Sequence, residues 1–121
     1  METVEQKDKE ILANIARENG WIPNPLKLME NRPGTVQTFM EHKARIFNGG
    51  PLNKKEQVLI SLAVAAAIRS EHCMNVNAEE AKKEGINKDE IVQALLITSL
   101  MVGNSLLHIA YKAMNKSVHN E

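Results

Sequence analysis

The chain has 121 residues, of which 43% are hydrophobic, so it is long enough to bury a core and predicts a single domain spanning residues 1–121. Its 15 basic and 15 acidic residues cancel, so no long-range field favours nucleic acid or an anionic membrane as a partner. One cysteine cannot form an internal disulfide, and no N-terminal signal segment or run of about 18 apolar residues stands out, which together favour a reducing cytoplasm and no membrane.

The first half of the chain is predicted to be helical, because Ala, Leu, Ile and Met are frequent and short alternating β-branched runs are missing. A first helix is predicted over Glu5–Glu18 and closes at Gly20. A short helical turn is predicted over Leu26–Asn31, after prolines that cannot continue the first helix. The next helix is predicted over Pro33–Phe47 and stops at a glycine-rich stretch.

A strongly apolar helix is predicted over Lys54–Ile68, opened by a capping box of Asn53 and Glu56. A helix that is apolar nearly all round needs neighbours on several faces, and the other helices are few and short. The sequence therefore predicts that the chain assembles into a homo-oligomer. A further helix is predicted to begin at Glu71.

The last part of the chain predicts two helices rather than one. The first runs from Lys88 to about Met101 and begins with a second capping box, formed by Asn87 and Glu90. A separate amphipathic helix is predicted to follow and to carry Leu106, Leu107, Ala110 and Met114. The tail from Lys116 is predicted to fray. The fold class predicted from the whole chain is all-α, with about six helices.

Three stretches stand in an order that resembles a known family: IPNPLKLMENRPG, NGGPLNKKEQVLISLAVAAAIRSEHC and NAEEAKKEGINKDEIVQALLITSLMVGNS. From Trp21 to about Ser105 the chain is similar to the carboxymuconolactone decarboxylase superfamily, in particular to its AhpD-like alkylhydroperoxidase branch. The resemblance implies a compact helical domain that forms trimers, often paired into hexamers, and a peroxiredoxin-like antioxidant activity. No cofactor is expected, because no nucleotide, flavin or metal motif is present.

The family pattern combines a glutamate on the apolar helix, a C-x-x-C pair, and then a histidine, an alanine and a glycine. Cys73 falls on the second cysteine, and Ala81 and Gly85 fall on the alanine and the glycine. The departures are Ser70 at the first cysteine, Asn77 at the histidine and Val58 at the glutamate. The resemblance therefore implies that the proton relay and the resolving thiol are missing.

Cys73 is the candidate peroxidatic thiol. If Ser70 caps the helix that begins at Glu71, Cys73 lies in its first turn, where the helix dipole stabilises a thiolate by about 0.3–1 kcal/mol. A serine hydroxyl cannot resolve a sulfenic acid, so oxidised Cys73 would need a thiol reductant from outside the chain. The alternative is that Cys73 is a buried core cysteine, and the sequence leaves both interpretations open.

The histidines give weaker indications. His72 is adjacent to Cys73, but adjacent helical residues do not face each other, so His72 is a possible pocket or subunit-contact residue rather than a base for the thiol. His108, on the last predicted helix, is the best distant candidate for a base. No metal site is expected, because His42, His72, His108 and Cys73 show no paired spacing.

Three functions stay open from the sequence. The first is a peroxiredoxin-like thiol protein that uses Cys73 with an external reductant, its activity weak or lost. The second is a lactone decarboxylase or isomerase with His72 or His108 as acid or base. The third is a non-catalytic oligomeric or small-molecule-binding member of the fold, favoured by the departures from the catalytic pattern.

Overall fold

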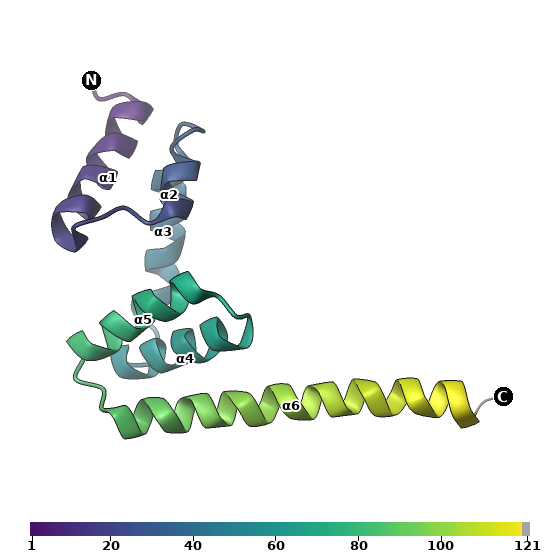
Figure 1. Ribbon diagram of the computed structural model, residues 1–121. Coiled ribbons are helices and arrows are strands. Elements are labelled where there is room, and N and C mark those ends of the chain that lie inside the picture. Colours follow the sequence, from purple (N-terminus) through teal and green to yellow (C-terminus); the bar gives the residue numbers. More distant parts are fainter. Residues whose placement is uncertain (120–121) are drawn as a thin grey trace. The chain divides into compact units, whose positions relative to one another are not determined.

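The computed structural model describes residues 1–119, which form six α-helices and no strand (Figure 1). The all-α prediction is therefore confirmed. The helices are α1 (Val4–Asn19), α2 (Asn24–Met29), α3 (Thr35–Phe47), α4 (Lys54–Ala67), α5 (Glu71–Lys83) and α6 (Lys88–His119). They divide between two compact units, one ending at Gly50 and one beginning at Pro51, and each unit has a core of its own. The prediction of one domain stays a prediction.

The first unit buries one residue from each of its three helices: Leu12 of α1, Leu26 of α2 and Val36 of α3. Partly buried side chains pack around this cluster, namely Ile11, Ile15, Ile22, Met29 and Met40. The α1 helix ends as predicted at Gly20, whose left-handed backbone (φ 80°) is accessible to glycine at little cost.

A buried carboxylate joins α1 to the start of α3. Asp8 is 1% exposed, and its Oδ2 accepts a hydrogen bond from the Gly34 backbone N–H at 2.8 Å. Its Oδ1 accepts from the Gln37 side-chain amide at 2.9 Å and from the Gln37 backbone N–H at 3.3 Å. Asp8 thus supplies the side-chain cap that α3 does not obtain from its own N-cap residue, Gly34.

The sequence predicted that this helix begins at Pro33, but α3 begins at Thr35. The cap from Asp8 explains the difference. The chain reaches Asp8 through Gly34, which adopts a left-handed backbone with φ 87°. A Cβ atom at this position would lie 3.3 Å from Cγ1 of Val4 on α1, so a side chain here would crowd the approach of the two helices. Proline at the first turn was a correct signal for a helix start nearby, but the tertiary contact with Asp8 decides the first residue.

Asp8 should make the stability of the first unit depend on pH. Burial by itself would raise the pKa of the Asp8 carboxyl, but the hydrogen bonds from the Gln37 side chain and from the Gly34 and Gln37 N–H groups outweigh it and hold the pKa below 3.8. A carboxyl whose folded pKa is depressed stabilises the fold above the unfolded pKa. This stabilisation is lost as the pH falls through the folded pKa.

We expect Asp8→Asn to lower the melting temperature at pH 7, because the amide would present an N–H group to backbone donors. The loss should begin to shrink below about pH 4, where the carboxyl of the unfolded chain takes up a proton, and should vanish once the pH has fallen through the lower pKa of the folded Asp8. Thermal denaturation followed by circular dichroism between pH 3 and pH 7 measures both effects. Glu41→Gln, which removes an exposed carboxylate from α3, is the matched control and should leave the melting temperature nearly unchanged. Equal losses in the two variants would contradict the capping role of Asp8.

The second unit buries Val58 of α4 against Ala81 of α5 and Ile86 of the following turn. The α4 helix packs against both α5 and α6 (Figure 1). Both predicted capping boxes are present, one at Asn53 and one at Asn87.

An ion pair between Lys55 and Glu90 links the beginnings of α4 and α6. The Lys55 ammonium and the Asn87 backbone N–H hold the pKa of Glu90 below its ordinary value. Glu90 therefore serves both in the capping box of α6 and in an ion pair with α4.

The C-terminal part of the chain differs from the prediction, because α6 is a single helix from Lys88 to His119. The sequence predicted a break after Met101 and fraying from Lys116. Gly103 lies inside the helix, and a glycine in a helix interior costs only about 0.5–1 kcal/mol. Without a proline, this cost is too small to end a helix that packs against α4, even though Asn104 and Ser105 follow the glycine.

The continuous helix α6 exposes a large apolar surface. The side chains that are more than half exposed are Leu96, Ile97, Leu100, Met101, Leu106, Leu107, Ile109, Tyr111 and Met114. By length and composition, Lys88–Lys116 could cross a membrane, with a mean hydropathy of 1.5 in its most apolar window. The core helix of a soluble protein can meet the same criteria, so one such helix is weak evidence of a membrane span. Polar residues interrupt the segment, so it holds no unbroken run of 18 apolar residues, but as a single helix it meets a criterion of length and mean hydropathy.

Candidate functional site

The turn between α4 and α5 carries the candidate site. It closes α4 with two backbone hydrogen bonds, from Arg69 N–H to Ala66 O at 3.1 Å and from Ser70 N–H to Ala65 O at 2.9 Å. These two bonds form the Schellman motif that commonly ends helices, in which the residue that donates the shorter-range bond has a left-handed backbone. The left-handed residue is Arg69, with φ 57°, and no other non-glycine residue among positions 1–119 has a positive φ.

Arginine is an unfavourable choice at this position. A left-handed backbone costs a residue with a Cβ about 1–2 kcal/mol, whereas glycine adopts it freely. A cation near the carboxyl end of a helix recovers about 0.3–1 kcal/mol through the helix dipole. The favourable effect is smaller than the cost, so helix capping alone does not account for a guanidinium at position 69.

The next residue, Ser70, is the N-cap of α5, which begins at Glu71 as the sequence predicted. The Ser70 hydroxyl accepts a hydrogen bond from the Cys73 backbone N–H at 3.3 Å. Cys73 consequently lies in the first turn of α5, and its side chain is exposed. The interpretation of Cys73 as a buried core cysteine is therefore wrong for the folded chain.

The other two positions that the AhpD-like resemblance points to, 58 and 77, serve the fold. Val58 is 4% exposed and belongs to the core of the second unit. The Asn77 side-chain amide donates to the Cys73 backbone carbonyl oxygen at 2.8 Å, one helical turn back. Neither side chain can move a proton near neutral pH.

The two histidines that the sequence singled out lie on different helices. His72 is exposed on α5 and does not line the groove described below, and His108 is exposed on α6. Among residues 1–119, no cluster of three or more His, Cys, Asp or Glu side chains could hold a metal ion.

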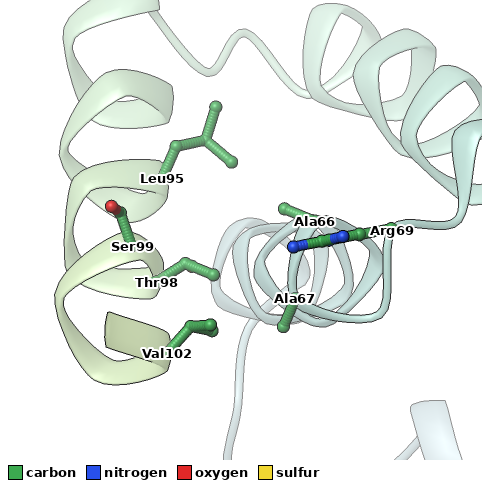
Figure 2. Close-up of a pocket in the computed structure, with 7 residues that line it drawn as sticks. All are labelled: Ala66, Ala67, Arg69, Leu95, Thr98, Ser99 and Val102. Atoms are coloured by element: carbon green, nitrogen blue, oxygen red, sulfur yellow. The ribbon is translucent and has the colours of Figure 1, made fainter. Parts of the chain in front are cut away.

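A groove lies between the end of α4 and the middle of α6 (Figure 2). Its volume is about 240 Å³, and its walls are formed by Ala66, Ala67, Arg69, Leu95, Thr98, Ser99 and Val102. The sequence did not predict this groove, because no periodicity indicates that Arg69 turns back toward α6. The only sequence signal for it was an arginine, Arg69, in place of a glycine in the turn between the apolar helix and the Ser70 cap.

The carboxymuconolactone decarboxylase family model matches residues 33–116, which include α3 to α5 and most of α6. The chain belongs to the carboxymuconolactone decarboxylase family. This carboxymuconolactone decarboxylase family member is also similar to a crystal structure of a protein from Methanobacterium thermoautotrophicum, a structural genomics target, with a TM-score of 0.68 and 27% sequence identity. The similarity covers 73% of this chain and 96% of that one. No curated protein matches the chain.

The unusual backbone of Arg69 in this family member leads to a stability prediction. We expect Arg69→Gly to leave the free energy of unfolding within about 1 kcal/mol of the parent, since relief of the left-handed backbone offsets the added freedom of the unfolded chain. Arg69→Val should lower it by about 1–3 kcal/mol, because a β-branched residue is poorly tolerated at positive φ. Urea denaturation at one fixed protein concentration measures both values. A larger loss for the glycine variant than for the valine variant would refute the assigned backbone.

Proposed function

We propose that this chain is a one-cysteine thiol protein of the AhpD-like branch, in which Cys73 reacts with peroxides and is reduced by an external thiol. The observation that carries the proposal is the position of Cys73, exposed in the first turn of α5 with its backbone N–H bound to the Ser70 hydroxyl. This end of a helix favours an anion, and exposure gives a peroxide access to the sulfur.

The proposed reaction has two stages. The Cys73 thiolate attacks one oxygen of the hydroperoxide, the O–O bond breaks, and the products are a sulfenic acid and an alcohol once the alkoxide takes up a proton. The sulfur loses two electrons, and the peroxide gains them. An external thiol then attacks the sulfenic sulfur and releases water, and a second external thiol breaks the mixed disulfide and regenerates Cys73.

Turnover is expected to be slow, because three of the family's catalytic positions carry other residues. Val58 fills the core, Asn77 binds a backbone carbonyl, and Ser70 caps α5. Proton transfer by a positioned side chain contributes typically about 10²–10⁴-fold to a rate, and this contribution is missing here. No observation on His72 or His108 in the described structure favours the lactone alternative.

Mass spectrometry after brief exposure to dilute hydroperoxide tests the proposal. We expect Cys73 to gain one oxygen, about 16 Da, and to lose it again on addition of a small thiol. The same protein should show little steady-state turnover with a dithiol reductant system that depends on an internal disulfide. A Cys73 thiol that stays unmodified under conditions that oxidise a free cysteine peptide would disprove the proposal.

A serine-to-cysteine variant tests the same proposal by adding a thiol that can form a disulfide with Cys73. Ser70→Cys places a second thiol where the Ser70 hydroxyl now meets the first turn of α5. Mild oxidation should form a disulfide with Cys73 and remove about 2 Da. Ser61→Cys on α4 is the matched control, and it should leave Cys73 as a sulfenic acid.

A second candidate function, a non-catalytic oligomeric protein, is favoured by the exposed apolar surface of α6. Water-soluble monomers rarely expose an apolar patch larger than a few hundred Å², and larger patches mark interaction sites. The first half of α6 packs against α4, a helix of 14 residues that is too short to span a bilayer. We therefore propose that further copies of this chain cover α6, as trimers or hexamers of a cytoplasmic protein.

Light scattering at micromolar concentration in detergent-free buffer should give a mass several times that of the 13.5 kDa chain. We expect Leu107→Glu, in the distal half of α6, to shift the mass toward that of the monomer, because burying an unpaired carboxylate at an interface is unfavourable. Lys82→Glu on α5 is the control and should leave the mass unchanged. A monomeric parent protein, or a parent that stays soluble only in detergent, would exclude this assembly.

A further inference from the structure

We infer that the groove between α4 and α6 binds a small monocarboxylate with an apolar body, held by the guanidinium of Arg69. The carboxylate would pair with Arg69, and the apolar body would lie against Ala66, Leu95 and Val102. This site lies beyond the proposed chemistry of Cys73, which does not line the groove. Either proposal can therefore fail while the other holds.

Charge is the first argument for this ligand. Arg69 is the only charged residue among those that line the groove, and no carboxylate lines it. The Arg69 side chain is exposed and makes no hydrogen bond or ion pair with any other residue that the structure describes. A planar guanidinium offers two parallel N–H donors that match the two oxygens of a carboxylate.

The backbone supplies the second argument. Figure 2 shows the Arg69 side chain lying across the end of α4, with its nitrogen atoms directed toward α6. This direction depends on the left-handed backbone at Arg69, with φ 57°. Glycine would satisfy the turn at lower cost, but it would leave the groove without a cation. Residues held in sparsely populated backbone regions cluster at ligand sites, where the surrounding structure compensates for the strain.

The size and walls of the groove limit the rest of the ligand. A volume of about 240 Å³ lies just below the roughly 300–1,000 Å³ of typical ligand pockets, which favours a small ligand of about eight to ten non-hydrogen atoms. The Thr98 hydroxyl already donates to the Ala94 carbonyl oxygen at 2.8 Å. Alanine, leucine and valine form most of the remaining wall, so an aromatic ring or a short alkyl chain is favoured over a sugar or an inorganic anion.

Binding of benzoate and hexanoate to the full chain, followed by ligand-observed NMR and isothermal titration calorimetry, tests the inference. We expect dissociation constants at or below about 1 mM for both acids. Benzyl alcohol, which has the same ring without the charge, should bind at least about tenfold more weakly. Arg69→Gln should also weaken benzoate binding at least about tenfold, whereas the control Lys82→Gln, on exposed α5, should leave it unchanged.

Arg69→Gly separates a binding role from a structural one. If Arg69 serves the ligand, the glycine variant loses benzoate binding and keeps its melting temperature. Equal benzoate affinity in the parent and in Arg69→Gln, equal affinity for benzoate and benzyl alcohol, or no binding of either acid would each overturn the inference. If neither acid binds and Arg69→Gln lowers the oligomer mass in light scattering, the groove is instead covered by a second copy of the chain.

Discussion

The left-handed turn at Arg69 is the constraint on which the second unit depends. It reverses the chain after α4 within three residues, so that Ser70 can cap α5 and the core residues Val58 and Ala81 can meet. The same turn directs the guanidinium into the groove and leaves Cys73 exposed in the first turn of α5. One backbone conformation thus determines the positions of the thiol, the cation and the core.

The positions that would form a peroxidase relay in the AhpD-like pattern contribute here to folding. A glutamate at position 58 would have to be buried, and valine fills that space without a charge. An asparagine at position 77 binds the carbonyl oxygen of Cys73 and so strengthens the first turns of α5. Serine at position 70 is among the best residues for an N-cap. Each of these three residues contributes to the pair of helices α4 and α5.

The α6 helix packs against α4 within the second unit and still exposes many apolar side chains. Its first half has a partner in α4, and the Lys55–Glu90 ion pair fixes where it begins. Its second half continues as helix, with Leu106, Leu107 and Met114 exposed. The cost of exposing so much apolar surface to water is the physical basis of the proposed assembly.

The sequence by itself determined the helical class, most helix ends and the family. These follow from local signals: apolar spacing, the capping boxes at Asn53 and Asn87, and the glycine after α1. It also placed Cys73 in the first turn of a capped helix, since Ser70 lies three residues before it. Local chemistry decides these features, because the interacting groups are within one helical turn of each other.

Only the tertiary structure decided the start of α3, the continuity of α6, the exposure of Cys73 and the existence of the groove. The first depends on Asp8, which is 26 residues from Gly34 along the chain. The second depends on packing against α4, which outweighs the small cost of Gly103. The burial of a cysteine and the direction of an arginine depend on which helices surround them, and no spacing in the sequence contains that information.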